Sequence, residues 1–404
     1  MKKIFQVALG IIAAIGGYLD IGDLVFNTQA GARFGYQLLW AIPVGLLGII
    51  VFAEMSGRVA AVAKKANFEL VRERYGRRLG LVTLVSSLVL SFLTLAAELG
   101  GVGLALTLFF DGPEQTFMLI GVLVLMAASW FLSFDHIERI FGYGGLTLLV
   151  FVVAAIHSHP DWHRLGNGFV PSSQSSSLYW YFAVGLVAAA FMPYEIYFYS
   201  SGAREEGWTN KDLGLNRANA IIGYTLGGLL AVALLVTAAE VFQPAGVDPT
   251  HLGTTVLGAQ AAFGETGLVL ALIGVLFAVG GACIDTCFSV AYNLAQYQGW
   301  KWGKKAGRPR EWTITWIATF IGGYIVVSTG IDPIELTEYA VVLSVLALPL
   351  TYLPILLVAA DRQVMGEHAN GWLAKTLGWA YFGVICVLTV AAPVLLVTTN
   401  GGGG

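Results

Sequence analysis

The sequence predicts an all-α protein that crosses a membrane many times. Of its 404 residues, 57% are hydrophobic and 12% are charged, whereas about a quarter of the residues in an ordinary soluble domain are charged. Glycine contributes 50 residues, as is typical of helices that pack closely within a membrane. Apolar runs long enough to cross about 30 Å of hydrocarbon recur along the whole chain. We therefore expect residues 1–404 to form a single transmembrane domain.

These apolar runs predict about eleven transmembrane helices. The expected spans are residues 5–31, 36–62, 79–110, 116–133, 138–157, 177–202, 219–242, 268–298, 312–329, 336–360 and 373–398. The first run resembles a signal peptide, because it has a positive end and small residues after an apolar stretch. However, DIGD follows it where a cleavage site would be needed, so we interpret the run as the first span.

The distribution of basic residues predicts the orientation of the chain. Residues 64–78 contain six Lys or Arg, and residues 301–310 contain five. Cytoplasmic connections carry an excess of these residues, so we expect a cytoplasmic N-terminus and an extracytoplasmic C-terminus. Only Arg33 and Arg164 of the 22 Lys and Arg then fall on the outer side. We expect a multi-pass protein of the cell membrane, which is the inner membrane or the plasma membrane.

Two of the expected spans carry features that interrupt a helix. In the first span, GYLDIGDLV at residues 17–25 places Asp20 and Asp23 on either side of a glycine. In span 6, Pro193 removes a backbone donor and blocks the preceding turn. Interrupted helices five spans apart are typical of transporters of the LeuT type, which are built from inverted repeats.

This pattern predicts a 5+5 inverted repeat. Residues 1–158 would form the first repeat with spans 1–5, residues 177–360 the second repeat with spans 6–10, and residues 373–398 an additional span 11. Unwound backbone is tolerated at membrane depth only where it lines a site enclosed by protein. We therefore expect a substrate to bind where the two breaks meet.

Five acidic side chains lie well inside the expected spans, and no Lys or Arg lies there with them: Asp20, Asp23, Glu98, Glu195 and Asp285. An ionised carboxylate in hydrocarbon costs at least about 2.5 kcal/mol, so each acid should hold a proton or a cation. Any single acid is equally well explained as a protonated, hydrogen-bonded structural group. All six histidines lie at span ends or in loops. The pattern disfavours an anionic substrate.

Met192 lies beside the break in span 6 and would face the break in span 1. A thioether is a soft ligand that prefers transition metals, whereas carboxylates and carbonyls alone suit Mg²⁺ or Ca²⁺. Two carboxylates, unwound carbonyls and one sulfur would form a mixed site for Mn²⁺ or Fe²⁺. The alternative is that Met192 is an ordinary apolar packing residue.

Several stretches resemble one family over nearly the whole chain. They are TQAGARFGYQLLW after DIGD, LAAELGGVGLAL in span 3, FMPYEIYFYS in span 6, and VLALPLTYLPILLVAADRQVMGEHAN in and after span 10. In motif and order they are similar to the NRAMP divalent-metal transporters, and the chain looks like a divergent bacterial branch related to that family. The resemblance implies transport of Mn²⁺ or Fe²⁺ together with protons.

The resemblance also implies roles for particular residues. Asp20 matches the metal-binding aspartate of the family, Asp23 the asparagine of the span 1 motif, and Met192 the metal-binding methionine. Ala189 matches the residue whose carbonyl binds the metal. Glu98 matches a span 3 glutamate that is linked to proton movement.

The chain departs from the family pattern in groups that would carry protons. Ile21 replaces the proline of the span 1 motif, and Tyr194 and Tyr199 replace the two histidines of span 6. Leu95 replaces an acid in span 3. A tyrosine, with an ordinary pKa of about 10, does not titrate near neutral pH as a histidine does. We therefore expect proton coupling to be weakened or absent.

The sequence leaves the ion and two acids unassigned. Met192 favours Mn²⁺ or Fe²⁺, while the extra carboxylate of Asp23 favours a harder ion such as Mg²⁺. Glu195, beside Tyr194, either points into an inner vestibule or caps the second half of helix 6. Asp285 is either a relocated proton or Na⁺ site or a hydrogen-bonded acid that braces a glycine-rich helix.

We therefore expect a transporter or facilitator of divalent metal ions that works by alternating access, and not an enzyme. An alternative with the same fold is a transporter of a small organic cation or an amino acid. An intramembrane aspartate dyad is disfavoured because Asp20 and Asp23 share one segment, whereas a dyad needs facing carboxylates. We expect a metal ion as the substrate, the lipid bilayer as surroundings, no cofactor, no nucleic-acid partner and a monomer.

Overall fold

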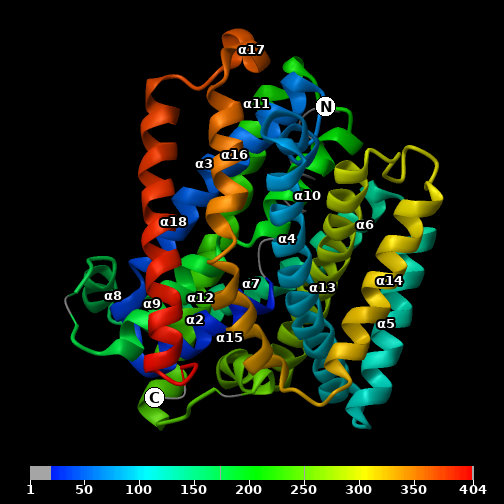
Figure 1. The fold of residues 1–404 in the computed structure, drawn as a ribbon. Coiled ribbons are helices and arrows are strands. Elements are labelled where there is room, and N and C mark those ends of the chain that lie inside the picture. Colours follow the sequence, from blue (N-terminus) through cyan, green and yellow to red (C-terminus); the bar gives the residue numbers. More distant parts are fainter. Residues whose placement is uncertain (1–19, 173, 250, 403–404) are drawn as a thin grey trace.

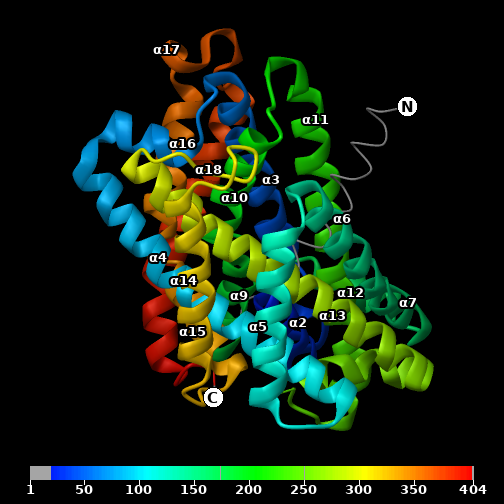
Figure 2. The same ribbon diagram turned by 90° about the vertical axis from the view of Figure 1, so that its right-hand side faces the viewer.

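The computed structural model describes residues 20–172, 174–249 and 251–402, and these residues form helices joined by turns and loops, with no strand (Figures 1 and 2). The helices of the first part are α2 (Ile21–Phe34), η1 (Gly35–Leu38), α3 (Ala41–Ala63), α4 (Asn67–Phe110), α5 (Glu114–Phe131), α6 (Phe134–Gly145), η2 (Leu146–Leu148), α7 (Leu149–His157) and α8 (Trp162–Gly168). Those of the second part are α9 (Ser177–Ala189), α10 (Pro193–Glu205), η3 (Asn210–Asp212), α11 (Leu213–Ala218), η4 (Asn219–Gly223), α12 (Tyr224–Ala245), α13 (Leu252–Gln298), α14 (Arg310–Val327), α15 (Pro333–Ser344), α16 (Leu348–Ala360), α17 (Arg362–Met365), η5 (Gly366–His368) and α18 (Trp372–Thr398).

The described residues contain eight helices that are long and apolar enough to cross a membrane, or nine if the bent pair α15 and α16 counts as one span. Two of the eleven expected spans are missing from that set. The first part of span 1 lies outside the described residues, so only α2 is seen of it. α14 covers most of the expected span 312–329 but is less apolar than the others.

Two helices are longer than the sequence pattern predicts. The charged connection 64–78 is largely helical, because α4 begins at Asn67 and continues through a kink at Gly76, where φ is +84°. Glu69 stabilises this start by accepting a hydrogen bond from the N–H of Ala66 (2.8 Å), as in a capping box. α13 likewise begins well before the expected residue 268 and is interrupted at Gly264.

Span 10 is bent, although the sequence analysis treats residues 336–360 as one helix. α15 and α16 meet at an angle of 47°. Pro349, in the first turn of α16, lacks an N–H and its ring crowds the carbonyl four residues earlier. That carbonyl belongs to Val345, and the hydroxyl of Thr389 in α18 donates to it (2.9 Å). The bend thus follows from proline chemistry, and a neighbouring helix satisfies the freed backbone oxygen.

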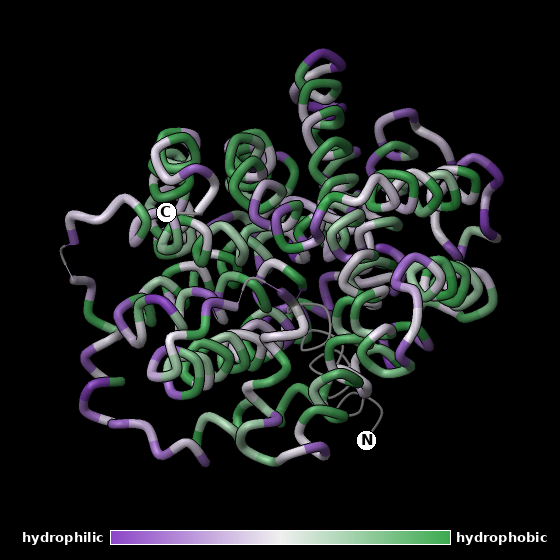
Figure 3. Tube along the Cα trace, turned by 90° about the horizontal axis from the view of Figure 1, so that it is seen from below, coloured by the Kyte–Doolittle hydropathy of each residue, from purple (hydrophilic) through white to green (hydrophobic). Residues whose placement is uncertain are grey.

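The outer surface of the bundle is apolar, as a surrounding bilayer requires. Along α18, four valines lie three or four residues apart and are all more than half exposed: Val387, Val390, Val394 and Val397. Figure 3 shows the helices coloured mainly as hydrophobic, with hydrophilic segments concentrated in the connections. An exposed apolar face of this extent is expected where lipid takes the place of water.

Inside the bundle, α2 packs closely against α12. All residues of α2 from Ile21 to Ala32 are buried. A Cβ at Gly31 would lie 2.2 Å from the carbonyl oxygen of Leu235 in α12, so only glycine allows this approach of the two backbones. The close contact fixes the position of α2, and therefore of Asp20 and Asp23 at its start.

The Lys- and Arg-containing segments gather at one end of the bundle. α11, α17 and the connection between α13 and α14 lie at that end, and the last turn of α18 lies at the other (Figures 1 and 2). We refer to the former as the basic end.

A buried carboxylate ties α10 to the connection between α13 and α14 at the basic end. Glu205 accepts a hydrogen bond from the hydroxyl of Tyr292 (3.1 Å). The backbone N–H groups of Lys304 and Lys305 donate to the same carboxylate, at 2.6 and 3.1 Å. Gly303 permits this turn, because its φ is +92° and a Cβ there would lie 2.2 Å from Oε1 of Glu205. We call this arrangement the Glu205 clasp.

The side chain of Lys304 extends the clasp to α5. Its Nζ donates to the carbonyl of Ser129 (2.7 Å) and to that of Leu132, at the C-terminal end of α5, where a positive charge is favourable. Partial burial, followed by the nearby charge of Arg308, lowers the pKa of Lys304 to about 8, and Glu205 opposes this change. The clasp therefore joins α5, α10 and α13.

Replacement of the clasp carboxylate should destabilise the protein. Glu205→Ala leaves two N–H groups and a buried hydroxyl without their acceptor, so we expect the free energy of unfolding to fall by about 2–3 kcal/mol. Thermal unfolding of the purified protein in detergent measures this. Glu311→Ala, which removes an exposed carboxylate in α14, is the control and should change it by about 0.5 kcal/mol or less. Equal unfolding temperatures for the two variants would contradict the clasp.

Candidate metal site

The break predicted in span 6 is confirmed. α9 ends at Ala189 and α10 begins at Pro193, with residues 190–192 between them. In a continuous helix, the carbonyl of Ala189 would accept a hydrogen bond from the N–H of residue 193, but proline has none. The N–H of Phe191 turns back to Ala188 instead (2.9 Å). The break therefore frees the carbonyl that the sequence analysis assigns to a metal.

At the start of α2, Asp20 caps the helix. Its backbone is extended, and its Oδ1 accepts a hydrogen bond from the N–H of Asp23 (3.1 Å), which is the usual arrangement of an N-cap. Asp23 lies in the first turn, is buried, and has a carboxylate oxygen, Oδ2, without a hydrogen-bond partner among the described residues. The predicted first half of helix 1 lies outside the described residues.

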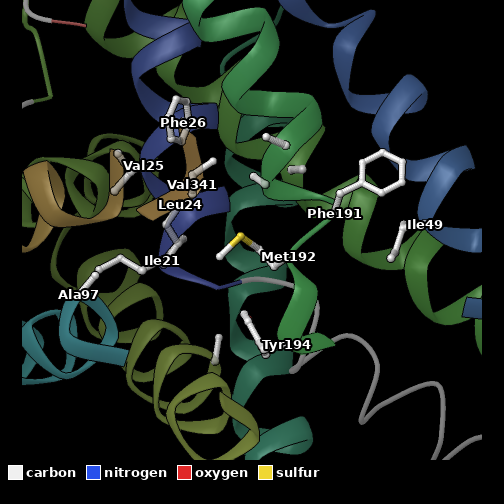
Figure 4. Close-up of a cluster of buried hydrophobic side chains, with 14 of the residues drawn as sticks. Ile21, Leu24, Val25, Phe26, Ile49, Ala97, Phe191, Met192, Tyr194 and Val341 are labelled. Carbon is white, nitrogen blue, oxygen red and sulfur yellow. The ribbon is translucent and has the colours of Figure 1, made fainter. Parts of the chain in front are cut away.

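The start of α2 meets the break in span 6. The hydroxyl of Tyr194, in the first turn of α10, donates to Oδ2 of Asp20 (3.1 Å). Figure 4 shows the sulfur of Met192 between Tyr194 and the start of α2, close to Ile21 and Leu24. The side chains of Asp20, Met192 and Tyr194 are all almost completely buried. Residues 174 positions apart in the sequence are thus in contact at the start of α2.

Gly22, between the two aspartates, is required by the packing. A Cβ at this position would lie 2.9 Å from Oδ1 of Asp20 and 2.9 Å from a methyl group of Val341 in α15. A larger side chain would therefore push against the carboxylate that caps α2. The glycine keeps Asp20 in its place against Tyr194.

Glu98 lies in α4 and is completely buried. Its Oε1 accepts a hydrogen bond from the hydroxyl of Thr286 in α13 (3.4 Å), and its Oε2 has no hydrogen-bond partner among the described residues. The hydroxyl of Ser289, one turn further along α13, donates to the carbonyl of Tyr194 (3.1 Å). Thr286 and Ser289 were not predicted from the sequence, although both lie in the glycine-rich segment around Asp285, residues 280–290.

Glu195 and Asp285 lie near this site without joining it. Glu195 follows Tyr194 in α10 and is buried, whereas Asp285 in α13 is partly exposed. Among the described residues, no three or more His, Cys, Asp or Glu side chains are placed to hold one metal ion. A metal between the breaks would therefore need the carbonyl of Ala189 and the sulfur of Met192 in addition to Asp20 and Asp23.

Comparison with known proteins relates this arrangement to a family of transporters. The chain matches the family model for natural resistance-associated macrophage protein-like proteins (Nramp) over residues 10–395. A crystal structure of the manganese transporter of Eremococcus coleocola, in complex with an aromatic bis-isothiourea substituted compound, matches with a TM-score of 0.77 and 21% identity, over 96% of this chain and 85% of that one. The structure of a histidine-to-alanine mutant of the same transporter matches with a TM-score of 0.80 and 20% identity, over 98% of this chain and 86% of that one.

A more distant structure shares the fold. The substrate-bound, outward-open state of a Na⁺-coupled sialic acid symporter matches with a TM-score of 0.63 and 11% identity, over 96% of this chain and 89% of that one. The fold and its interrupted helices thus define an all-α, polytopic membrane protein of the LeuT type. Because the family model covers nearly the whole sequence, the chain belongs to the Nramp family.

Filling the space at Gly22 should disturb the site without removing any polar group. In Gly22→Ala, the new methyl group presses on Asp20 and Val341, and overpacking of this kind costs about 1–3 kcal/mol. Gly214→Ala is the matched control, because a Cβ at Gly214 in α11 meets no atom within 4 Å. We expect a lower temperature of thermal unfolding for the first variant only. A Gly22→Ala protein as stable as the control would contradict the close packing around Asp20.

Proposed function

We propose that this protein transports divalent metal ions across a membrane by alternating access, with Mn²⁺ or Fe²⁺ as the expected substrates. The proposed ligands are Asp20, Asp23, the carbonyl of Ala189 and the sulfur of Met192. The observation that carries the proposal is the hydrogen bond from Tyr194 to Asp20, which holds the start of α2 against the break between α9 and α10. A manganese transporter among the similar structures supports the same choice of substrate.

The chemistry of these groups suits a transition metal with some hard character. Two ionised carboxylates would neutralise the charge of a divalent ion, and the thioether would favour Mn²⁺ or Fe²⁺ over Mg²⁺ and Ca²⁺. The C-terminal end of α9 carries the negative end of a helix dipole, which favours a cation beside Ala189. Asp23 supplies a carboxylate where the family pattern has an amide. Because carboxylates favour hard ions, Mg²⁺ is a further candidate substrate.

We further propose that the ion moves down its gradient without the proton relay expected of the family. Tyr194 stands where that relay would use a histidine, and its hydroxyl is engaged with Asp20. Glu98 is the group best placed to retain a proton, because it is completely buried and its Oε2 has no hydrogen-bond donor among the described residues, which disfavours the ionised carboxylate. The proposal assigns transport and no chemical change of the substrate.

The proposed orientation places the basic end of the bundle in the cytoplasm. The charge distribution supports it, since basic residues favour the cytoplasmic side. α18 would then end on the outer side of the plasma membrane or a bacterial inner membrane. A monomer is proposed, with the site enclosed in a single chain.

Asp20→Ala should abolish metal uptake while the protein remains folded. The variant removes a ligand, the N-cap of α2 and the acceptor of Tyr194, so Mn²⁺ uptake into proteoliposomes should fall to the level of empty vesicles. Asp248→Ala is the control, because this carboxylate is exposed and pairs with Arg33 at the surface. Gel filtration and thermal unfolding report folding. Uptake by Asp20→Ala at the rate of the control would refute the assignment of the site.

Proton movement can be measured in the same vesicles with a trapped pH-sensitive dye. We expect saturable Mn²⁺ uptake without acidification of the interior, because the tyrosines of α10 do not titrate in the working range. Acidification in proportion to uptake would contradict this expectation. If acidification were observed and then lost in Glu98→Gln, Glu98 would be identified as the group that carries the proton.

A further inference from the structure

Glu195 is a buried carboxylate that the site described above does not use. It lies in the first turn of α10 with 7% of its surface exposed, and neither of its carboxylate oxygens has a hydrogen-bond partner among the described residues. A buried carboxylate in this situation is strongly unfavourable unless a proton or a cation accompanies it. The side chain therefore points to a ligand.

The electrostatic surroundings of Glu195 are negative. Tyr194, the residue before Glu195, donates to Asp20 at the start of α2, and its carbonyl accepts a hydrogen bond from Ser289 of α13 (3.1 Å). Asp285 lies one turn before Ser289 in α13, and Glu98 of α4 accepts a hydrogen bond from Thr286, the next residue (3.4 Å). The carboxylates of Asp20, Asp285 and Glu98 therefore surround the start of α10. Repulsion among these groups favours a positive charge between them, so the region around Glu195 attracts cations.

Asp285 continues this negative region toward the basic end. Glu138 of α6 lies one turn after Phe134, whose ring stacks on that of Phe198 in α10 (5.7 Å between ring centroids). Glu206 directly follows the last turn of α10. Asp285 is also partly exposed, unlike Glu98. Carboxylates thus follow one another from the helix breaks to the basic end of the bundle.

The arrangement suits an ion that keeps part of its water shell. The described residues offer no group of three or more acidic, His or Cys side chains that could hold one metal directly. Small divalent ions dehydrate reluctantly and commonly retain waters when only one or two carboxylates bind them. Several binding positions of low affinity along one path also allow an ion to leave as easily as it enters.

We propose that Glu195 and Asp285 form a second position for the transported cation, which a hydrated divalent ion occupies between the Asp20–Met192 site and the basic end of the bundle. This inference rests on the proposed function, since it concerns the path of the same ion. In this proposal, Glu195 accepts the ion when it leaves the Asp20–Met192 site, which we call the first site. Glu138 and Glu206 continue the path toward solution.

The proposal can be tested by calorimetry, which measures the equilibrium binding of Mn²⁺ to the full chain in detergent. We expect two classes of site in the wild-type protein, one tight and one weak. Glu195→Gln should lose the weak class and change the affinity of the tight class by less than about twofold. In proteoliposomes, its maximal rate of Mn²⁺ uptake should fall at least about fivefold, because the ion leaves the first site more slowly. A fivefold change corresponds to about 1 kcal/mol.

Two further variants make the result decisive. Asp285→Asn should reproduce the loss of the weak class, and it tests the proposal if Glu195→Gln does not fold. Glu335→Gln removes an exposed carboxylate in the first turn of α15 and should leave both classes and the rate unchanged. A single class of Mn²⁺ site in the wild-type protein, or a weak class that survives in both Glu195→Gln and Asp285→Asn, would overturn the second position.

The outcome is separable from that of the proposed function. Asp20→Ala should lose the tight class and retain the weak one. If the tight class survives in Asp20→Ala while the weak class is lost in Glu195→Gln, the assignment of the first site fails and the second position stands. If Asp20→Ala loses the tight class and Glu195→Gln loses nothing, the first site stands and the second position fails.

Discussion

The structure depends on how buried carboxylates are accommodated in an apolar bundle. Asp20 has two partners, since it caps α2 through the N–H of Asp23 and accepts the hydroxyl of Tyr194. Asp23, Glu98 and Glu195 each retain at least one oxygen without a hydrogen-bond partner among the described residues. Each such oxygen would favour the unfolded state unless a proton or a cation bound it. The stability of this bundle and its affinity for cations therefore have a common origin.

Proline determines which backbone carbonyls lack a hydrogen-bond donor within their own helix and are free to bind another group. Pro193 deprives the carbonyl of Ala189 of its helical donor, whereas the carbonyl freed by Pro349 is taken by Thr389 in α18. The same local chemistry thus has two outcomes, and the difference lies in whether a neighbouring helix supplies a donor. The carbonyl of Ala189, at the break that precedes Met192, therefore stays a candidate ligand.

Sequence reasoning was most successful where a local rule decides the structure. The break at Pro193 follows from the chemistry of one proline within its own segment. The bend at Pro349 could have been predicted by the same rule, but the apolar run around it masked the signal. The helical part of residues 64–78 was missed because its charges indicated a loop.

The contacts of the site could not be predicted in this way, because they join distant segments. The bond from Tyr194 to Asp20 spans 174 positions, and that from Thr286 to Glu98 spans 188. Composition indicates that buried acids need partners, but it does not say which hydroxyl supplies one. The family resemblance singled out Asp20 and Met192 as ligands, whereas the contacts of Thr286 and Ser289 follow from the packing of α13.

The Glu205 clasp bears on how the pH dependence of this transporter should be interpreted. Any opening of the bundle at the basic end must either carry α5, α10 and α13 together as one rigid body or break the hydrogen bonds to Glu205. The link to α5 depends on the charge of Lys304, whose pKa of about 8 lies within the range of ordinary assays. A transport rate that changes around this pH can therefore reflect loss of the link between Lys304 and α5 rather than a proton carried with the transported ion.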